Sequence, residues 1–211
     1  MRVTFPRLAD QEIAYAVVER DDGVVYRLQG GRAGTALPHD IRHLVVEREL
    51  GVTDGIWGGI AAGAVFTSMR QLSGRRLPHA LQHSAELKRN YRDRLLRAEL
   101  LADLVESVAG LADPTLEEIR LLTESRLMGL RDTAPSPEAV ADAALALQVE
   151  AARWARLRPG QEIQYEWPPR VPRQVRRRHG LACRGDIDLC LPARRAKVYG
   201  CQPSRYTRRN S

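Results

Sequence analysis

The chain has 211 residues, of which 44% are hydrophobic and 5% aromatic, so its composition supports a globular core built mainly from Leu, Val and Ala. No apolar run follows a basic N-terminus, and the longest apolar stretch, Ile56 to Met69, is too short to span a bilayer. We therefore expect no secretory leader, no membrane span and a cytoplasmic location.

The net charge of +7 is unevenly distributed along the chain. Residues 170–211 contain twelve Lys and Arg and two acids, so this segment carries +10 and residues 1–169 carry −3. Such asymmetry is typical of a basic arm that binds nucleic acid or another polyanion. We predict a single domain over residues 1–169 and a basic, poorly structured tail over residues 170–211.

The N-terminal part predicts a small antiparallel sheet. Residues 12–20 and 24–29 are strand-like and flank Asp21-Asp22-Gly23, and Asp-Gly between such runs is a strong hairpin signal. Val3 and Phe5 predict an additional edge strand. Near the end of the domain, residues 161–167 alternate in polarity and predict a strand that returns to the hairpin.

About five helices are expected between these strands, which gives an α+β fold. Helical spacing of apolar residues predicts helices over residues 37–50, over 56–72, and from His79 or Ser84 to about Gly110. Two more helices begin at Asp113-Pro114 and Ser136-Pro137, where a capping residue precedes a proline.

The segment Leu37-Pro38-His39-Asp40-Ile41-Arg42-His43 carries the strongest hint of chemistry. Residues four apart lie on one face of a helix, so His39 and His43 could bind one metal ion. Zinc is commonly held by two such His and a third ligand from elsewhere, with a position left for water. Asp40 stands where HExxH metallopeptidases carry their general base, which predicts a catalytic base or a group that orients a ligand.

The third ligand is not fixed by this helix. Glu47 lies eight residues after His39, about 12 Å along the axis, so one ion cannot bind His39, His43 and Glu47 together. A second segment, Leu77-Pro78-His79-Ala80-Leu81-Gln82-His83, repeats the Leu-Pro-His-x-x-x-His pattern. We predict His79 and His83 as further metal ligands in a mono- or dinuclear site, with Asp40 and Glu47 as catalytic carboxylates.

Structural roles compete with this interpretation. An acid in the first turn, such as Asp40, complements the helix dipole without any metal, and His43 fits a hydrogen-bonded core histidine. Metal-free acid–base chemistry or anion binding at the helix N-terminus is a further alternative. The leading hypothesis is a zinc hydrolase-like protein with a small-molecule or peptide substrate, and a structural adaptor without a site is the opposing one.

The tail supports the runner-up to the zinc hypothesis, a non-enzymatic protein that holds nucleic acid or another polyanion. Its basic side chains would contact phosphates without reading sequence, and they include Arg173, Arg176, Arg177, Arg178, Arg194, Arg195 and Lys197. All three cysteines, Cys183, Cys190 and Cys201, also lie there, and an odd number argues against a disulfide framework. With His179 they could form only a loosely spaced zinc site, because no CxxC pair is present.

The run Leu-Pro-His-Asp-x-x-His-x-Val-Val-Glu is followed by Trp57-Gly58 and by the Ala-Ala-Gly-Ala segment of residues 61–64. Together these motifs resemble a widespread uncharacterised bacterial protein family over about residues 21–69. The resemblance implies a bacterial origin and no particular activity.

Overall fold

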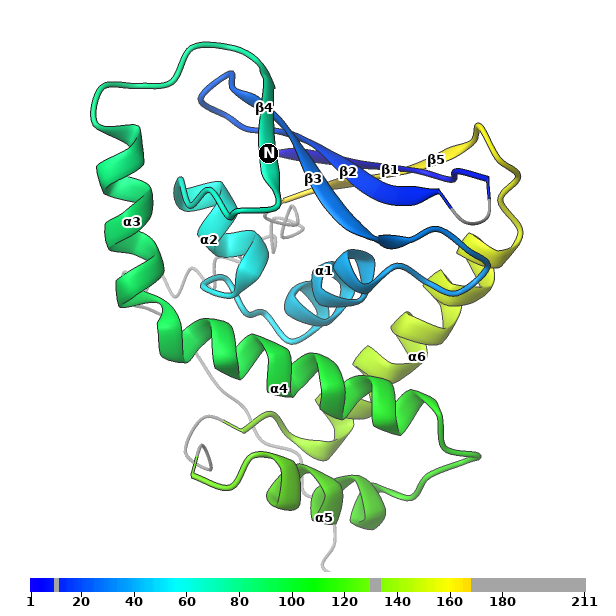
Figure 1. Cartoon of the computed structure of the whole chain (residues 1–211). Helices are drawn as coiled ribbons and strands as arrows, with labels where there is room; N and C mark the ends of the chain where they lie inside the picture. Colours follow the sequence, from blue (N-terminus) through cyan, green and yellow to red (C-terminus); the bar gives the residue numbers. More distant parts are fainter. Residues whose placement is uncertain (10–11, 130–133, 168–211) are drawn as a thin grey trace, which may run out of the picture. The chain divides into compact units, whose positions relative to one another are not determined.

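The computed structural model describes residues 1–9, 12–129 and 134–167, and these form a sheet layer and a helical layer (Figure 1). The fold is α+β, as the sequence predicts, and α1 (His39–Glu49) lies between the sheet and the long helix α4 (Arg92–Ala109). No helix within the described residues is both long and apolar enough to cross a bilayer.

The sheet is antiparallel, with the strand order β4-β3-β2-β1-β5. Its strands are β1 (Arg2–Pro6), β2 (Ile13–Glu19), β3 (Val25–Arg32), β4 (Met69–Ser73) and β5 (Glu162–Glu166). The β2–β3 hairpin turns at Asp-Gly as predicted, and β5 returns to the N-terminal strands. However, β1 is not an edge strand, because it pairs with β2 on one side and with β5 on the other.

The prediction of one helix over residues 56–72 is wrong in its second half. Helix α2 (Ile56–Ala62) ends at Gly63, whose φ of 118° places it in the region that only glycine adopts without strain. The chain then turns and residues 69–73 form β4, which pairs with β3 through Leu28 and Met69. Pairing with a neighbouring strand, which is invisible to local periodicity, decides the conformation of these residues.

The long helix predicted up to Gly110 is two helices, α3 (Ala80–Asn90) and α4 (Arg92–Ala109), which meet at Tyr91. Helix α3 packs against the segment after α2, where Ser84 Oγ accepts from Val65 N at 2.8 Å and Lys88 Nζ donates to Val65 O at 3.0 Å. Helix α4 instead packs against α1 and α6 (Pro137–Ala155). The chain therefore changes direction at Tyr91. Residues that follow one apolar helical pattern in the sequence pack against the segment after α2 on one side of Tyr91 and against α1 and α6 on the other.

Local capping explains where the last two helices begin. Ser136 accepts from Ala139 N at 3.2 Å and Pro137 opens α6, as predicted. Helix α5 (Leu116–Arg126) begins two residues later than Asp113-Pro114 suggests, because Thr115 and Glu118 form a capping box.

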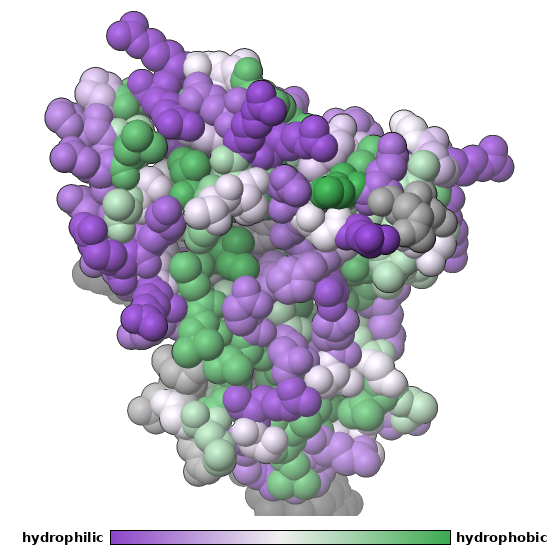
Figure 2. All heavy atoms as spheres, viewed as in Figure 1, coloured by the Kyte–Doolittle hydropathy of each residue, from purple (hydrophilic) through white to green (hydrophobic). Residues whose placement is uncertain are grey.

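The hydrophobic core is centred on α1. Ile41, Leu44 and Val45 are fully buried, and on the adjoining α2 Trp57 is also fully buried. Most of the face drawn in Figure 2 is polar, with apolar side chains gathered over the helical layer. Because α1 is enclosed on nearly all sides, the polar residues it carries into the core, His43 and Glu47, need a specific explanation.

Candidate metal centre

Helix α1 begins so that both histidines of the first motif are helical. Pro38, with φ −57° and ψ 141°, is the N-cap, and its carbonyl accepts from Ile41 N and Arg42 N at 3.1 Å each. His39 is the first helical residue, so His43 lies one turn further on the same face. The indole of Trp57 donates to Asp40 O at 3.1 Å and fixes this first turn from α2.

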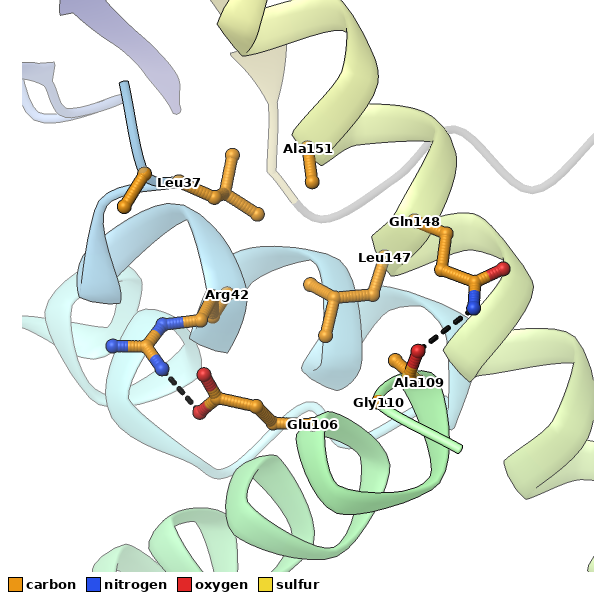
Figure 3. Close-up of a pocket in the computed structure, with 9 residues that line it drawn as sticks. Leu37, Arg42, Glu106, Ala109, Gly110, Leu147, Gln148 and Ala151 are labelled. Carbon is orange, nitrogen blue, oxygen red and sulfur yellow. Dashed lines mark hydrogen bonds and ion pairs between the residues drawn. The ribbon is translucent and has the colours of Figure 1, made fainter. Parts of the chain in front are cut away.

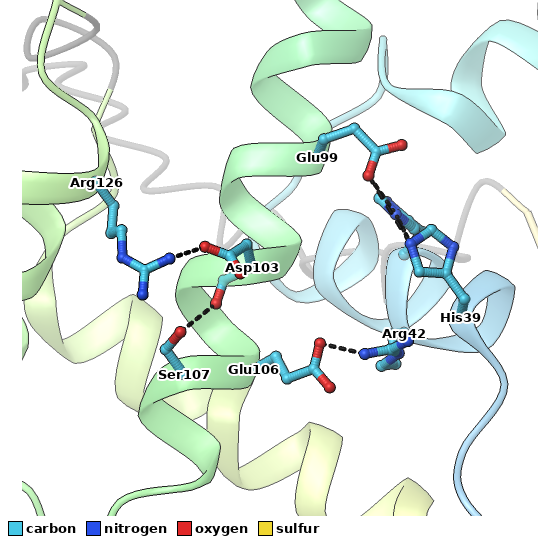
Figure 4. Close-up of polar contacts among 8 residues, drawn as sticks. His39, Arg42, Glu99, Asp103, Glu106, Ser107 and Arg126 are labelled. Atoms are coloured by element: carbon cyan, nitrogen blue, oxygen red, sulfur yellow. Dashed lines mark hydrogen bonds and ion pairs between the residues drawn. The ribbon is translucent and has the colours of Figure 1, made fainter.

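Glu99 on α4 completes a group of three ligand-type side chains. His43 Nε2 lies 3.2 Å from His39 Nε2 and 3.2 Å from Glu99 Oε2, and His39 Nε2 lies 3.9 Å from the same oxygen. Figure 4 shows Glu99 reaching from α4 towards His39 on α1. Within the described parts of the chain, this is the one group of three or more His, Cys, Asp or Glu whose ligand atoms converge within 4.8 Å.

These separations match the spacing that zinc imposes on its ligands. Nitrogen and oxygen ligands sit about 2.0–2.1 Å from a tetrahedral zinc ion, so two of them lie roughly 3.3 Å apart. Two of the three observed separations are 3.2 Å and the third is 3.9 Å. A small shift of the exposed His39 or Glu99 side chain would equalise them.

The electrostatic state of His43 suits a ligand. Burial first, and then the positive fields of His39 and Arg42, lower the pKa of His43 to about 3. Its imidazole is therefore neutral near pH 7, which is the form that binds metals. Its Nδ1 atom is buried and has no hydrogen-bond partner among the described residues, so without an ion the Glu99 carboxylate favours the tautomer that carries the proton on Nε2.

The group is buried on one side and open on the other. The His43 side chain is 1% exposed, whereas those of His39 and Glu99 are 56% and 52% exposed. Three ligands with one solvent-facing side is the arrangement of catalytic zinc sites, in which water takes the remaining position. Structural zinc sites, in contrast, use four protein ligands.

The two carboxylates predicted as catalytic lie on α1 in different surroundings. Asp40 is partly buried next to β3, where a Cβ added to Gly30 would lie 2.9 Å from Asp40 Oδ2. Burial raises the pKa of Asp40, while the charges of His39 and Arg42 oppose that shift and Glu99 adds to it. Asp40 is thus close enough to the His39–Glu99 group to sense its charge.

Glu47 is engaged at the start of α2. Its two carboxylate oxygens accept from Ile56 N at 2.6 Å and Trp57 N at 3.0 Å, so Glu47 caps this helix from outside. A Cβ on Gly55 would lie 2.5 Å from the carboxylate carbon, which explains the glycine there. A catalytic role for Glu47 stays a prediction.

The structure does not bring His79 and His83 to the group. His79 is the N-cap of α3, and its Nδ1 lies 3.0 Å from Gln82 Oε1. His83 Nε2 donates to Ala62 O at 3.2 Å. Both side chains are exposed, and neither has two further ligand-type groups beside it among the described residues.

Sequence reasoning missed Glu99 because nothing local marks it. It is one of several charged residues on the exposed side of a long helix, and the distance of 56 residues from His43 hides their contact. The tail residues predicted to contact nucleic acid, Arg173 to Lys197, lie outside the described residues.

No family model, no curated protein and no solved structure matches this chain. The case for a metal site therefore depends on the geometry of His39, His43 and Glu99 alone.

Proposed function

We propose that this protein binds one divalent metal ion, best zinc, through His39, His43 and Glu99. The observation that supports the proposal is the convergence of three ligand atoms at separations of 3.2, 3.2 and 3.9 Å. A hydrogen-bonded His–Glu pair accounts for the Glu99–His43 contact alone. The His39–His43 contact is also within hydrogen-bonding distance, but one neutral His43 Nε2 cannot donate to Glu99 and accept from His39 at the same time, so the two contacts together support an ion.

The open side of the group supports a hydrolytic role within this proposal. A zinc ion with three protein ligands lowers the pKa of its bound water towards 7 and so supplies a nucleophile for ester or peptide hydrolysis. Asp40, adjacent to His39, is the proposed base or orienting group. The substrate would be a small molecule or peptide that reaches the exposed edge between α1 and α4.

Metal content tests the proposal directly. Wild-type protein should hold one zinc per chain after dialysis, and His39→Ala or Glu99→Gln should weaken zinc binding by well over the roughly 10–100-fold typical of losing an outer-shell contact. Both side chains are more than half exposed, so these variants should fold. Zinc at 100 times its Kd should add about 2.7 kcal/mol to wild-type stability and nothing to either variant.

His79→Ala is the matched control, because it removes an exposed histidine from the repeated motif. It should bind zinc like the wild type. Equal, sub-stoichiometric metal in wild type, His39→Ala and Glu99→Gln would end the metal proposal.

Hydrolysis is tested separately with p-nitrophenyl acetate. The zinc-loaded protein should hydrolyse this ester. If Asp40 is the base, Asp40→Asn should keep the ion but hydrolyse the ester about 10²–10⁴-fold more slowly. Glu47→Gln tests the other predicted carboxylate in the same assay. If the metal-free protein hydrolyses the ester at the full rate, the esterase activity does not depend on the ion.

A further inference from the structure

A pocket of about 450 Å³ lies between the start of α1, the end of α4 and the middle of α6 (Figure 3). Its walls are mainly apolar, and they are formed by Ala36, Leu37, Ala109, Leu147 and Ala151, with Arg42, Glu106 and Gln148 as the polar members. Concave, mostly apolar pockets with a few polar groups are the usual sites for small molecules.

The polar side chains of this pocket bond to one another or to its wall, except that Arg42 Nε is buried and has no hydrogen-bond partner among the described residues. Arg42 Nη1 donates to a Glu106 carboxylate oxygen, and Gln148 Nε2 donates to Ala109 O at 2.8 Å. The two formal charges therefore neutralise each other. A carboxylate ligand would have to displace Glu106 from Arg42, and an ammonium ligand would have to displace Arg42 from Glu106. The pocket thus disfavours charged ligands and offers apolar surface to an uncharged chain.

Helix geometry connects the pocket to the candidate metal centre. Glu99 and Glu106 are seven residues apart on α4, so they lie on the same side of that helix, about 10 Å apart along its axis. On α1, Arg42 of the pocket directly precedes the ligand His43. Figure 4 shows the Arg42–Glu106 pair alongside the His39–Glu99 group. On α1, the pocket residues Leu37 and Arg42 lie within two residues of His39 and His43, so the end of a chain held in the pocket could reach the ligands from this side.

From these observations we propose that the pocket holds the aliphatic chain of an uncharged ester or amide whose carbonyl group lies at the His39–His43–Glu99 group. This inference rests on the proposed metal function for its chemistry, but the pocket itself does not require the ion. It names the substrate class as a neutral acyl compound of medium chain length.

Binding to the EDTA-treated protein tests the pocket without the metal. Octanamide should bind, measured by NMR titration or calorimetry, whereas octanoate, octylammonium and acetamide should bind at least about tenfold more weakly. Ala151→Phe places a ring in the pocket and should weaken octanamide binding by about tenfold or more. Ala152→Phe is the matched control, because Ala152 is the exposed neighbour on α6 and does not line the pocket.

The Arg42–Glu106 pair provides a second variant. Glu106→Gln frees Arg42, so octanoate should gain about tenfold in affinity and approach octanamide. The Glu106 side chain is 52% exposed, so this variant should fold. Absence of octanamide binding, equal losses in Ala151→Phe and Ala152→Phe, or octanoate binding to wild type as tightly as octanamide would each overturn the pocket assignment.

The connection to the ligands is tested with cobalt in place of zinc. Octanamide should change the visible absorption spectrum of the cobalt-loaded wild type and leave that of cobalt-loaded Ala151→Phe unchanged. Octanamide binding without a spectral change would overturn the connection. Octanamide binding by a protein that takes up no metal would contradict the metal function while leaving the pocket intact, so the two failures are distinguishable.

Discussion

The two Leu-Pro-His-x-x-x-His segments share a pattern but differ in structure. In the first, Pro38 is the cap and His39 is helical, so both histidines project from one face of α1. In the second, the cap is His79 itself, with φ 60° in the left-handed region, and the helix begins one residue later. Identical spacing therefore gives a convergent pair only where the helix starts at or before the first histidine.

The surroundings of the two segments differ as much as their backbones. Ile41, two residues after His39, is fully buried, whereas the corresponding Leu81 is 65% exposed. The first segment enters the core and meets Glu99 of α4, and the second lies at the surface. Burial fixes the orientation of His43, which is 1% exposed, whereas the exposed imidazoles of His79 and His83 have several rotamers open to them.

The largest expected effect comes from the matched apolar positions of the two segments. Ile41→Ala should lower the free energy of unfolding by about 2–5 kcal/mol, because it leaves a cavity in the core. Leu81→Ala should change it by less than about 0.5 kcal/mol, as an exposed substitution. Urea denaturation measures both. Similar losses of unfolding free energy in the two variants would show that Ile41 and Leu81 do not differ in burial.

The next effect concerns Glu47, which α1 carries into the core two turns after His39. Burial is the main cause that raises the pKa of Glu47 to about 7, against 4.5 for an ordinary Glu, while the α2 amides act in the opposite direction. Between about pH 4.5 and 7, the folded protein therefore keeps a proton on Glu47 that the unfolded chain has already lost. Stability should fall as pH rises through this window and level off above it, by an amount on the order of 3 kcal/mol.

Glu47→Gln isolates that contribution, because it cannot titrate while other groups titrate in both proteins. Between pH 5 and pH 8, the unfolding free energy of the wild type should fall relative to that of Glu47→Gln. Parallel pH profiles would mean that Glu47 keeps an ordinary pKa in the folded state. The position that corresponds to Glu47 in the second segment is Leu87, so no similar titration is expected there.

The smallest effect concerns the backbone of the two first histidines. His79→Gly should stabilise the protein by up to about 1 kcal/mol, since glycine adopts positive φ without strain. His39→Gly, at the first helical position, should destabilise it by about 0.5–1 kcal/mol. Thermal unfolding in EDTA compares the two without any contribution from metal. If both variants raise, or both lower, the unfolding free energy, the difference between the Pro38 cap of α1 and the His79 cap of α3 is contradicted.

The sequence predicts the parts of this fold that depend on local chemistry. The Asp-Gly hairpin and the start of α6 at Ser136-Pro137 are confirmed, and so is the α+β class. Helix α1 is present where expected but begins at His39, two residues later than the predicted range of 37–50. The shared face of His39 and His43 also follows from spacing alone.

Features that depend on tertiary neighbours could not be predicted in the same way. The strand at residues 69–73 exists because β3 offers a partner, and the turn at Tyr91 exists because α3 and α4 pack on different elements. Glu99 belongs to the same class of feature. Its neighbours in sequence are typical of any amphipathic helix, and only the packing of α4 on α1 brings its carboxylate to the two histidines.

The contacts between α1 and α2 close a loop of mutual support. Glu47 near the end of α1 accepts from the first amides of α2, and Trp57 of α2 donates to the first turn of α1, where His39 lies. The start of α1 is thus restrained by a seven-residue helix that the far end of α1 restrains in turn. Loss of either contact should therefore let the first turn of α1 fray. A change at Glu47 or Trp57, neither of which belongs to the His39–His43–Glu99 group, would then loosen the orientation of His39.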